Sequence, residues 1–480
     1  MSEGPASARE RRRTKIVCTI GPATRTVEMM CELIAAGADV FRLNFSHGTA
    51  ELHAENVAMT REAAKRCGKE VGILGDLPGP KLRLGDVEGG LVELPYDGVV
   101  ELSTEGGIGD RDRLPVSWAG VPGAVQVGGE VYLADGRIRL RVESKDATSA
   151  RCRIEVGGAV ASHQGLNLPG ADVALPSAGR DDLAWVDFAI EQAVDLLAVS
   201  FVRRAEDLEP VQRRIRTGGA DIPLIAKIEK PQAAERAEAI IKATTSGIMV
   251  ARGDLGIELP LEQVPSVQRR LISLAGKHSR PAITATQMLA SMVSSPRPTR
   301  AEVSDVANAI YQGTDAVMLS EETAVGENPV EAVRVMDRIA RATEPELPYG
   351  DWVFTRADSE GDVAASVARA AVGSCYTLGL AALIVPTRSG RTARLVSAHR
   401  PKVPVLAVSP RLETVRRLNL LFGVQCAMAD EWTGISALLD ECSTLARETG
   451  VAKPGDLIGI TAGLPNQELG TNLFEIHRVP

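Results

Sequence analysis

Eight short apolar segments alternate with amphipathic segments over roughly the first two thirds of the chain. The apolar segments span residues 15–20, 39–43, 71–75, 195–200, 224–228, 247–250, 281–285 and 315–319. Continuous apolar runs rich in β-branched residues are typical of strands buried on both faces, as in a parallel sheet. The segments between most of them are rich in Ala, Glu and Arg with helical periodicity, as at 28–36, 51–67, 232–242 and 265–277. Eight strand–helix units predict an α/β fold that closes into a (β/α)8 TIM barrel.

One connection in this series is much longer than the others. Between residues 75 and 195, strand-like segments at 89–94, 129–133, 137–142 and 150–156 alternate with Gly-rich turns. This pattern predicts a small β-barrel domain inserted into one loop of the larger barrel. An insertion at the carboxyl ends of barrel strands is well placed to act as a lid.

The strand–helix alternation begins again after about residue 347. Strands are expected at 381–385, 403–408 and 456–460, with helices at 391–398, 412–418 and 434–447. They predict a separate doubly wound α/β domain. The expected organisation is therefore a barrel in two parts, 1–80 and 176–347, a lid at 81–175 and a C-terminal domain at 348–480. Residues 1–13 are expected to be a disordered leader, and no further domain is expected after Pro480.

Composition and charge narrow the class of protein. Apolar residues make up 44% and charged residues 24% of the 480 residues, a balance typical of soluble globular proteins with aliphatic cores. The net charge of −8 argues against a general nucleic-acid binder. No apolar run reaches the ~18 residues of a membrane span, and the polar N-terminus is no secretory signal. Seven cysteines without a CxxC pair favour reduced thiols and a cytoplasmic location.

Polar side chains capable of chemistry stand at the carboxyl ends of seven predicted barrel strands. They are Arg42, Asn44, Asp76, Ser200, Lys227, Glu229, Asp254, Thr286 and Ser320. Each has an ordinary structural explanation when taken alone, such as a helix cap for Asn44 or a solvated ion pair for Lys227 and Glu229. All strand ends of a barrel meet at one face, where active sites lie. Together the residues therefore favour a single site.

The residue types in the fifth and sixth units fit a metal and an anionic substrate. Glu229 and Asp254 supply the hard oxygens that Mg²⁺ or Mn²⁺ prefers. The backbone N–H groups of Gly253 and Asp254 can hold a substrate carboxylate at the start of a helix. Lys227 places a point charge where it can stabilise a transferring phosphoryl group or an enolate oxygen.

Other residues fit phosphate binding and proton transfer. Arg42 and Arg83 offer planar guanidinium groups that match phosphate oxygens. The hydroxyl of Thr286 can relay a proton through water. A threonine is a poor acid, so it needs neighbours such as Ser320 and Glu322.

Six segments of the chain resemble pyruvate kinases. They are residues 14–22, 42–48, 227–229, 249–256, 285–289 and 296–302. The resemblance extends from about Thr14 to the end of the chain and covers all three expected domains. It implies transfer of the phosphoryl group of phosphoenolpyruvate to ADP, giving pyruvate and ATP in the last step of glycolysis. It also implies a Mg²⁺-dependent homotetramer in the cytoplasm.

The resemblance assigns roles by position. The implied catalytic residues are Arg42, Arg83, Lys227 and Thr286. The implied substrate-binding residues are Arg42, Lys227, Gly253, Asp254 and Thr286. The implied nucleotide-side residues are Pro22, Asn44, His47 and Arg83. Glu229 and Asp254 would hold the metal that bridges to the substrate, and the lid would exclude water.

The segment 79–84 resembles the branch of the family that does not need K⁺. Many members bind K⁺ through positions that match Asn44, Ser46, Asp76 and the carbonyl of Leu77. Those members carry a glutamate where this chain has Lys81. We expect the ammonium of Lys81 to supply the positive charge of the missing K⁺, so that K⁺ is not required. An exposed loop lysine is the alternative.

Two departures from the family concern the nucleotide. Leu52 replaces an aromatic residue seen in some members near the adenine. Gln164 stands where a lysine is common, which would weaken ADP phosphate binding or slow closure of the lid. Glu321 replaces a residue that is usually small, and we have no account of it.

A loop in the C-terminal domain resembles the family's loop for phosphorylated activators. It consists of Thr387, Arg388, Ser389, Gly390, Arg391 and Thr392. Hydroxyls, a glycine and a helix start make a cradle for a phosphate group, and a plain helix cap is the alternative. A sugar phosphate or a nucleoside monophosphate would suit it.

Two other functions stay open at this point. One is a pyruvate-releasing aldolase or lyase that uses the same metal and enolate chemistry on a barrel. The inserted domain and the C-terminal domain argue against it. The other is a non-catalytic sensor, against which the intact Lys227, Glu229, Asp254 and Thr286 argue.

Overall fold

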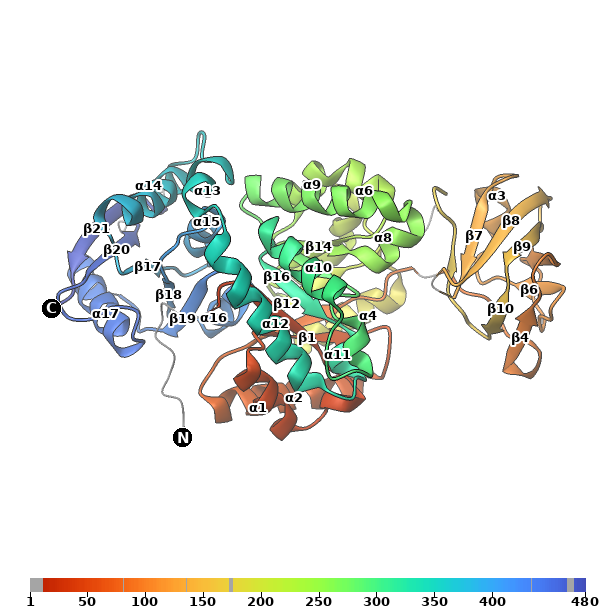
Figure 1. The fold of residues 1–480 in the computed structure, drawn as a ribbon, viewed down its shortest axis with the longest axis horizontal. Helices are drawn as coiled ribbons and strands as arrows, with labels where there is room; N and C mark the ends of the chain where they lie inside the picture. Colours follow the sequence, from red (N-terminus) through yellow and green to blue (C-terminus); the bar gives the residue numbers. More distant parts are fainter. Residues whose placement is uncertain (1–11, 81, 135, 172–175, 433, 464–469) are drawn as a thin grey trace.

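The computed structural model describes residues 12–80, 82–134, 136–171, 176–432, 434–463 and 470–480. Its three parts follow one another along the long axis, with a barrel between a small β domain and a C-terminal α/β domain (Figure 1). The expected boundaries near residues 80, 175 and 347 stay predictions. The prediction of a disordered leader over residues 1–13 is wrong for its last two residues, which the structure describes. Arg12 forms ion pairs with Asp39 at 2.8 Å and Asp337 at 2.9 Å, and residues 1–11 lie outside the described part.

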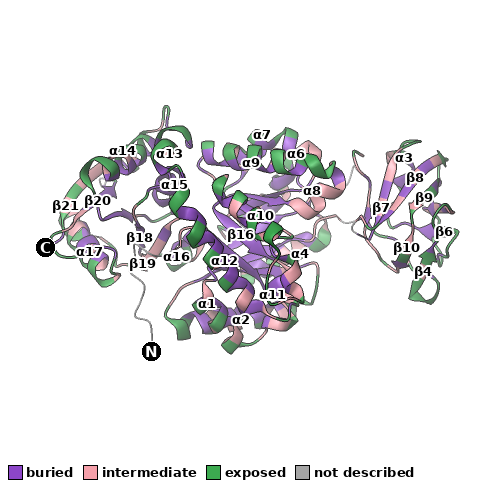
Figure 2. Ribbon diagram, viewed as in Figure 1, coloured by how far each residue is buried: buried purple, intermediate pink, exposed green. Residues whose placement is uncertain are grey.

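The predicted (β/α)8 barrel is confirmed. Its strands are β1 (Lys15–Thr19), β2 (Val40–Asn44), β3 (Gly72–Asp76), β12 (Leu196–Val199), β13 (Leu224–Ile228), β14 (Gly247–Ala251), β15 (Ala282–Ala285) and β16 (Ala316–Leu319). They close in the order β1-β16-β15-β14-β13-β12-β3-β2, and neighbouring strands are parallel. Nearly every strand residue is buried, because the helices cover the outside of the barrel and side chains fill the inside (Figure 2).

The helices around the barrel begin and end at residues with clear local reasons. They are α1 (Val27–Ala36), α2 (Ala50–Cys67), α4 (Arg180–Glu191), α5 (Glu209–Thr217), α6 (Pro231–Glu235), α7 (Ala237–Ala243), α8 (Arg252–Glu258), α9 (Val264–Lys277), α10 (Arg300–Tyr311), α11 (Glu321–Ala324) and α12 (Pro329–Thr343). The Thr49 side chain caps α2, and Gly68 ends it in the left-handed conformation. Thr299 and Glu302 form a capping box at α10. The single helix expected at 232–242 is instead two short helices, α6 and α7, which meet at Arg236.

The inserted β domain is a curled six-stranded sheet with a two-stranded sheet beside it. Its strands are β4 (Leu91–Leu94), β5 (Val99–Ser103), β6 (Arg113–Pro115), β7 (Glu130–Leu133), β8 (Ile138–Lys145), β9 (Ser149–Val156), β10 (Gly158–Ala161) and β11 (Leu166–Asn167), with the short helix α3 (Val121–Ala124). The strand orders are β11-β7-β8-β9-β5-β6 and β10-β4. Alternating buried residues on β8 and β9 fill its own apolar core. We refer to this domain as the lid.

The C-terminal part contains a five-stranded sheet in the order β19-β18-β17-β20-β21. Its elements are α13 (Tyr349–Thr355), α14 (Val363–Leu378), β17 (Ala382–Pro386), α15 (Arg391–Ala398), β18 (Val405–Ser409), α16 (Leu412–Leu418), β19 (Val424–Met428), α17 (Ile435–Glu448), β20 (Leu457–Ala462) and β21 (Leu473–Arg478). Only β21 runs antiparallel, on one edge. The predicted α/β domain is confirmed, although β19, β21, α13 and α14 were not expected.

The C-terminal domain contacts the amino-terminal ends of the barrel strands. Glu70, just before β3, receives hydrogen bonds from Arg416 at 2.8 Å and from Asn419 at 3.0 Å. The lid lies on the far side of the barrel from this contact (Figure 1). The carboxyl ends of the strands therefore face the lid. Within the described part of the chain, no helix is both long enough and apolar enough to cross a membrane.

Candidate active site

Four barrel strands bring Arg42, Asp76, Ser200 and Lys227 into one buried network. The Lys227 ammonium lies 3.2 Å from Asp76 Oδ1 and donates a 2.7 Å hydrogen bond to Ser200 Oγ. Arg42 Nε donates to Asp76 Oδ2 at 2.7 Å. Ser200 Oγ in turn donates to the carbonyl of Leu77 at 2.7 Å. Every side chain in this group is held by at least two polar contacts, so the network positions Lys227 rigidly.

The charges in this network shift one another's protonation. Burial raises the pKa of Asp76, but the charges of Lys227 and Arg42 outweigh it and hold the pKa below its usual range. Burial lowers the pKa of Lys227, but Asp76, Glu229 and Asp254 together raise it above its usual value. Lys227 therefore stays a cation and Asp76 an anion at neutral pH.

Glu229 and Asp254 form the pair of carboxylates expected to hold a metal. Glu229 follows β13 and is 1% exposed, 2.8 Å from the Lys227 ammonium, and accepts the Phe201 N–H at 2.7 Å. Burial raises the pKa of Glu229, the charge of Lys227 lowers it, and the charge of Asp254 raises it again. A buried and a half-buried carboxylate that repel each other fit a divalent cation, because the cation relieves this repulsion.

The number of carboxylates also fits one kind of metal. No cluster of three or more His, Cys, Asp or Glu side chains with metal-binding geometry occurs within the described residues. Mg²⁺ is commonly held by only one or two carboxylates, together with substrate oxygens and water. Glu229 and Asp254 therefore fit a Mg²⁺ ion whose other ligands come from a substrate and water.

Thr286 follows β15 in a turn with unusual backbone geometry. Both Thr286 and the next residue, Gln287, have positive φ angles, of +68° and +52°. The Thr286 hydroxyl accepts the Gly253 N–H at 2.7 Å and donates to the Ala285 carbonyl at 2.6 Å. The Gly253 N–H, which we expected to be free for a substrate carboxylate, is therefore bound to Thr286 in this structure.

Arg252 holds this turn in place. Its guanidinium donates to the Thr286 carbonyl at 2.6 Å and to the Ala285 carbonyl at 3.2 Å. Its Nη1 also contacts both carboxylate oxygens of Asp305 on α10, at 2.8 and 2.7 Å. A β-branched residue with positive φ is strained, so Arg252 supplies contacts that offset the strain at Thr286.

Glu322 ties together the loops after β15 and β16. Its carboxylate accepts the Leu289 N–H at 3.1 Å and the Ser320 N–H at 2.7 Å, and the residue is 2% exposed. From the sequence, we expected Ser320 and Glu322 to lie near Thr286 and assist its proton transfer. The structure places both residues on the adjoining loops and gives Glu322 a role in fixing them.

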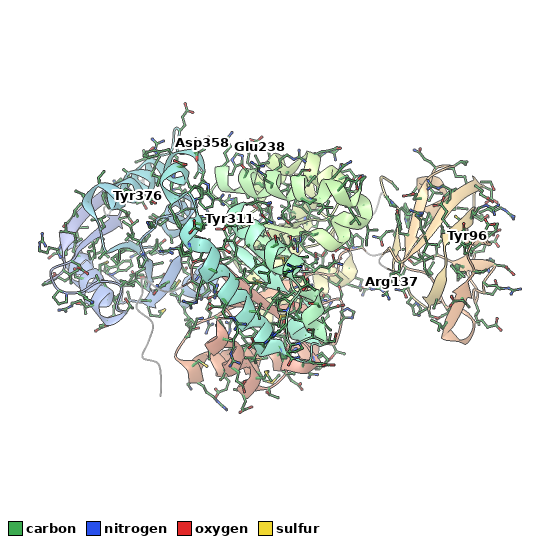
Figure 3. All side chains as sticks on the ribbon, viewed as in Figure 1. Tyr96, Arg137, Glu238, Tyr311, Asp358 and Tyr376 are labelled. Carbon is green, nitrogen blue, oxygen red and sulfur yellow. The ribbon has the colours of Figure 1, made fainter. Side chains whose placement is uncertain are left out.

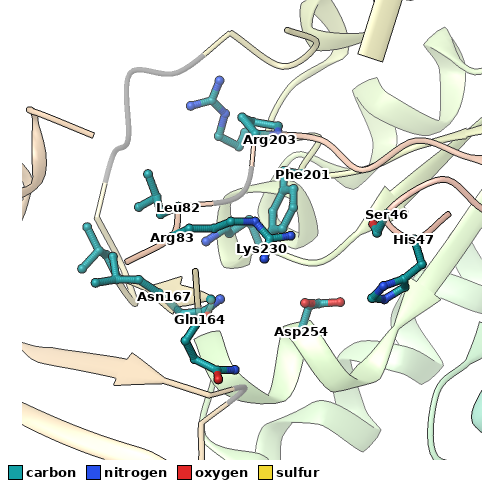
Figure 4. A pocket seen from close by; sticks show the side chains of 14 residues that line it. Ser46, His47, Leu82, Arg83, Gln164, Asn167, Phe201, Arg203, Lys230 and Asp254 are labelled. Carbon is teal, nitrogen blue, oxygen red and sulfur yellow. The ribbon is translucent and has the colours of Figure 1, made fainter. Parts of the chain in front are cut away.

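A cavity of about 260 Å³ lies between the barrel and the lid. It is lined from the barrel by Ser46, His47, Phe201, Arg203, Lys230 and Asp254, and from the lid side by Pro80, Leu82, Arg83, Gln164, Gly165, Leu166, Asn167 and Leu168. Asp254 and His47 lie on one side of it, with Gln164 and Asn167 on the other (Figure 4). One cavity is therefore lined by Asp254, an expected metal ligand, by His47, an expected nucleotide-side residue, and by Gln164, which stands where many family members have a lysine.

Polar contacts surround this cavity, and Glu258 joins the barrel to Gly170 and Asn167 on the lid side. Arg83 donates to the His163 carbonyl at 3.0 Å, so its guanidinium is held within the lid, at the turn between β10 and β11. Lys230 forms an ion pair with the buried Glu258 at the end of α8. Burial raises the pKa of Glu258, whereas Lys230 and hydrogen bonds from Gly170 and Asn167 on the lid side lower it. Arg137 lies on the side of the lid that faces the barrel (Figure 3).

Three of the four groups expected around a monovalent cation, all except the Ser46 hydroxyl, accept hydrogen bonds or form ion pairs within the protein. Asn44 Oδ1 accepts the Ser46 N–H at 3.2 Å, the Leu77 carbonyl accepts from Ser200, and Asp76 is paired as described above. Lys81, the expected substitute for K⁺, lies outside the described residues. Pro22 is exposed at the start of a short turn of helix, Pro22–Thr24.

The expected activator loop joins β17 to α15. Thr387 is buried, and its hydroxyl accepts the Gly390 N–H at 3.0 Å, while Gly390 has a φ of +80°. The Thr392 hydroxyl lies 2.5 Å from that of Thr471. The two cationic side chains of the loop point to carboxylates, Arg388 to Glu431 at 2.6 Å and Arg391 to Asp362. Ser389 is exposed.

Sequence reasoning missed Arg252, Lys230 and Arg203. Arg252 lies in the segment 249–256, but its contact with Asp305 joins two helices that are far apart in the chain, so no sequence pattern indicated it. Lys230 directly follows Glu229, and Arg203 lies three residues after Ser200. Their position just beyond the strand ends was a usable signal that they line the cavity.

Comparison with known proteins now identifies the family. A family model described as pyruvate kinase, barrel domain, matches residues 11–333. The chain belongs to the pyruvate kinase family. A second model, pyruvate kinase, alpha/beta domain, matches residues 365–477. The family is one of phosphotransferases, so the aldolase or lyase reading is set aside.

Named relatives agree along nearly the full chain. Pyruvate kinase of Geobacillus stearothermophilus is 42% identical over 472 residues, covering 97% of this chain and 80% of the relative. Pyruvate kinase 2 of a Synechocystis strain is 42% identical over 474 residues, covering 98% of this chain and 79% of the relative. A crystal structure of a pyruvate kinase from Cryptosporidium parvum superposes with a TM-score of 0.94 at 34% identity, covering 98% and 97% of the two chains.

Proposed function

We propose that the chain transfers the phosphoryl group of phosphoenolpyruvate to ADP and protonates the resulting enolate, giving pyruvate and ATP. The observation that carries this proposal is the position of Lys227. Its ammonium lies between Asp76 and Glu229 at the carboxyl ends of the barrel strands. A fixed, permanently charged lysine beside a pair of carboxylates suits a reaction in which negative charge moves between oxygens.

Glu229 and Asp254 would hold Mg²⁺ or Mn²⁺ in this site. When bound, the metal would neutralise charge on the substrate's phosphate and enolate oxygens. Lys227 acts from the barrel strand on the transferring phosphoryl group and on the enolate. Arg42, held by Asp76, offers its remaining N–H groups to a phosphate oxygen.

Thr286 stands on the proton-delivery side in this proposal. Its hydroxyl is held between the Gly253 N–H and the Ala285 carbonyl. Delivery of a proton to the enolate carbon requires the hydroxyl hydrogen to turn away from Ala285, directly or through a water. Because a threonine is a poor acid, the hydroxyl takes up a proton from water as it gives its own to the enolate carbon, and the Gly253 N–H holds its oxygen in place.

The lid carries Arg83 and Gln164 to the nucleotide side of the cavity. Closure of the lid would bring Arg83 to the phosphates and exclude water from the phosphoryl group. Pro22, Asn44 and His47 would contact the nucleotide from the barrel. Gln164 lacks the charge that a lysine would give there, so we expect a weaker hold on ADP.

The test is pyruvate formation from phosphoenolpyruvate and ADP with Mg²⁺, using Asp254→Asn and an exposed control, Asp181→Asn on α4. Asp254→Asn should abolish turnover and weaken Mn²⁺ binding measured by electron paramagnetic resonance, and the control should do neither. Normal turnover by Asp254→Asn would refute the site. An inactive wild-type protein that still binds Mn²⁺ would favour the sensor alternative.

We also propose that K⁺ is not required. The support is Lys81 in the sequence, together with the neutralisation of Asp76 by Arg42 and Lys227. The same assay in K⁺-free buffer should give full turnover, and Lys81→Glu should create a dependence on K⁺. Strong stimulation of the wild-type protein by K⁺ over Na⁺ would overturn this proposal.

Regulation and assembly complete the proposal. The loop 387–392 would bind a phosphorylated activator, and the chain would form a homotetramer. Exposed apolar side chains on α14, among them Tyr376 (Figure 3), and on the edge strand β21 support an oligomer. Light scattering should give four times the chain mass. A candidate sugar phosphate that leaves the phosphoenolpyruvate saturation curve unchanged fails as the activator.

A further inference from the structure

A cluster of arginines lines a small cleft at the other end of the barrel, between the barrel and the C-terminal domain. The lining includes Arg280 from before β15, and Arg356, Arg394 and Arg400 from the C-terminal domain. Asp315, just before β16, is the one carboxylate among the described residues of this lining. Four positive charges therefore face one negative charge.

The two innermost arginines share their few acceptors. Arg400 is fully buried and donates to Asp315 at 2.7 Å and to the Gly313 carbonyl at 2.7 Å. Arg356 is 8% exposed, donates to the same Gly313 carbonyl at 2.6 Å, and stays 4.0 Å from Asp315. The Nε atoms of both are buried without a hydrogen-bond partner.

Two glycines, Gly276 and Gly313, leave the space that the guanidinium of Arg356 occupies. A Cβ at Gly276 would lie 2.9 Å from Arg356 Cζ, and a Cβ at Gly313 would lie 2.5 Å from Arg356 Nη1. Gly276 lies in the last turn of α9, where glycine lowers helix stability. The space for the guanidinium of Arg356 therefore comes at a local cost, which is typical of a functional feature.

The outer pair of arginines is also short of partners. Arg394 donates to the Thr245 carbonyl at 3.3 Å, and the Nε atoms of Arg394 and Arg280 have no partner. Burial and the charges of Arg280 and Arg391 lower the pKa of Arg394 to about 10. Burial and the charge of Arg400 lower the pKa of Arg356 to about 9.

Uncompensated buried charge is costly, and an unpaired buried donor adds to the cost. We propose that this cleft binds a small inorganic anion, either chloride or a phosphate ion, which pairs with the unpartnered guanidinium N–H groups. Its free volume of about 10 Å³ is room for roughly one water-sized particle. Chloride is somewhat larger than a water molecule, so it requires the half-buried Arg280 and Arg394 to move apart slightly, and phosphate requires a larger movement.

The bound anion would join the barrel to the C-terminal domain. Arg280 belongs to the barrel, and the other three arginines belong to the C-terminal domain, so an anion between them replaces the repulsion among these side chains by attraction and adds to the Arg400–Asp315 ion pair. The arrangement of the two domains would then depend on the anion. This inference stands on the cleft alone and does not depend on the proposed catalytic site.

The test measures thermal unfolding in sodium gluconate as gluconate is replaced by chloride, or in a second series by phosphate, at constant ionic strength and pH. The wild-type midpoint should rise by at least about 2 °C and saturate, as expected for a ligand of the folded state. Arg280→Gln and Arg394→Gln should lose this response. Arg269→Gln, which changes an exposed arginine on α9, should keep it. Broadening of the ³⁵Cl resonance, present in wild type and reduced in Arg394→Gln, provides a second readout.

The chloride series and the phosphate series show which of the two anions binds in the cleft. A response confined to chloride or to phosphate identifies the ion and supports the proposal. A phosphate response that survives in both Gln variants belongs to another site, such as the loop 387–392, and overturns it. So does a wild-type midpoint that is the same in all three salts. Arg280→Gln alters a half-buried side chain and keeps the test decisive if Arg394→Gln fails to fold.

Discussion

Arg252 is expected to set the turnover rate although it is not expected to touch the substrate. Its guanidinium fixes the turn that holds Thr286, through the carbonyls of Thr286 and Ala285 and through Asp305. Replacement by leucine removes these contacts and leaves the strained turn free to relax. The turn at Thr286 would then populate other conformations, and the hydroxyl would move away from its position beside Gly253.

The size of the effect follows from the strain. A non-glycine residue with positive φ stores about 1–3 kcal/mol. If relaxation releases about 1.4 to 2.8 kcal/mol, the fraction of molecules with a productive turn falls about 10- to 100-fold, because each 1.4 kcal/mol is a factor of ten. The Asp305 carboxylate is 39% exposed, so loss of that ion pair adds at most about 1 kcal/mol to the change in stability.

The assay is steady-state kinetics of Arg252→Leu and Arg252→Lys, with the exposed Arg216→Leu on α5 as control. We expect kcat to fall with little change in the KM for phosphoenolpyruvate. Lysine should restore part of the rate, since it keeps the charge but not the planar fork. In a Thr286→Ala background, Arg252→Leu should cost little more, because both changes act on one hydroxyl. Additive losses, or an unchanged kcat, would refute this reasoning.

Three further predictions concern the metal, the pH and the nucleotide. Mg²⁺ should raise the unfolding temperature at pH 7.5. This rise should shrink as the pH falls through the raised pKa of Glu229, because protonation of Glu229 competes with metal binding. Glu229→Gln should abolish the rise, and the exposed control Glu238→Gln should keep it. Burial lowers the pKa of His399 to about 4 from an ordinary 6.5, so the unfolded chain binds the proton more tightly and stability is lost as the pH falls from 6.5 towards 4. At pH 5 this loss is about 2 kcal/mol of unfolding free energy. The variant His399→Asn keeps a donor toward the Val353 carbonyl, and its unfolding temperature should fall by several degrees less than that of the wild type between pH 7 and pH 5. An equal fall in both proteins would contradict this prediction. Gln164→Lys should lower the KM for ADP several-fold with the KM for phosphoenolpyruvate unchanged, and no effect on either would remove Gln164 from the nucleotide side.

The pattern of apolar residues was enough to predict the barrel and the strand ends that carry the site. Buried parallel strands are short and uniformly apolar, and each predicted segment differs from its observed strand by only a residue or two, as at Gly247–Ala251. The order of strands in a TIM barrel follows from the order in the chain. Arg42, Asp76, Lys227 and Glu229 could therefore be assigned to one face before any contact was known.

Weaker patterns led to the omissions. The edge strand β21 has mostly half-exposed residues, and β6, β10 and β11 of the lid have only two to four residues. Buried and half-exposed residues are mixed in β5, so none of these strands gives a continuous apolar signal. The prediction of one helix at 232–242 failed because no Pro or Gly marks the break at Arg236. These elements depend on packing with neighbours that are distant in sequence.

The sequence by itself determined which residue types stand at the strand ends, because local apolar patterns define strands and a closed barrel places their ends together. Only the tertiary structure decided which of these residues touch. It paired Lys227 with Asp76, Ser200 and Glu229, bound the Gly253 N–H to Thr286, and brought Arg252 to Asp305. It also gathered four arginines around Asp315 from two domains. Such contacts depend on side-chain directions and on the distance between elements, which a one-dimensional pattern does not contain.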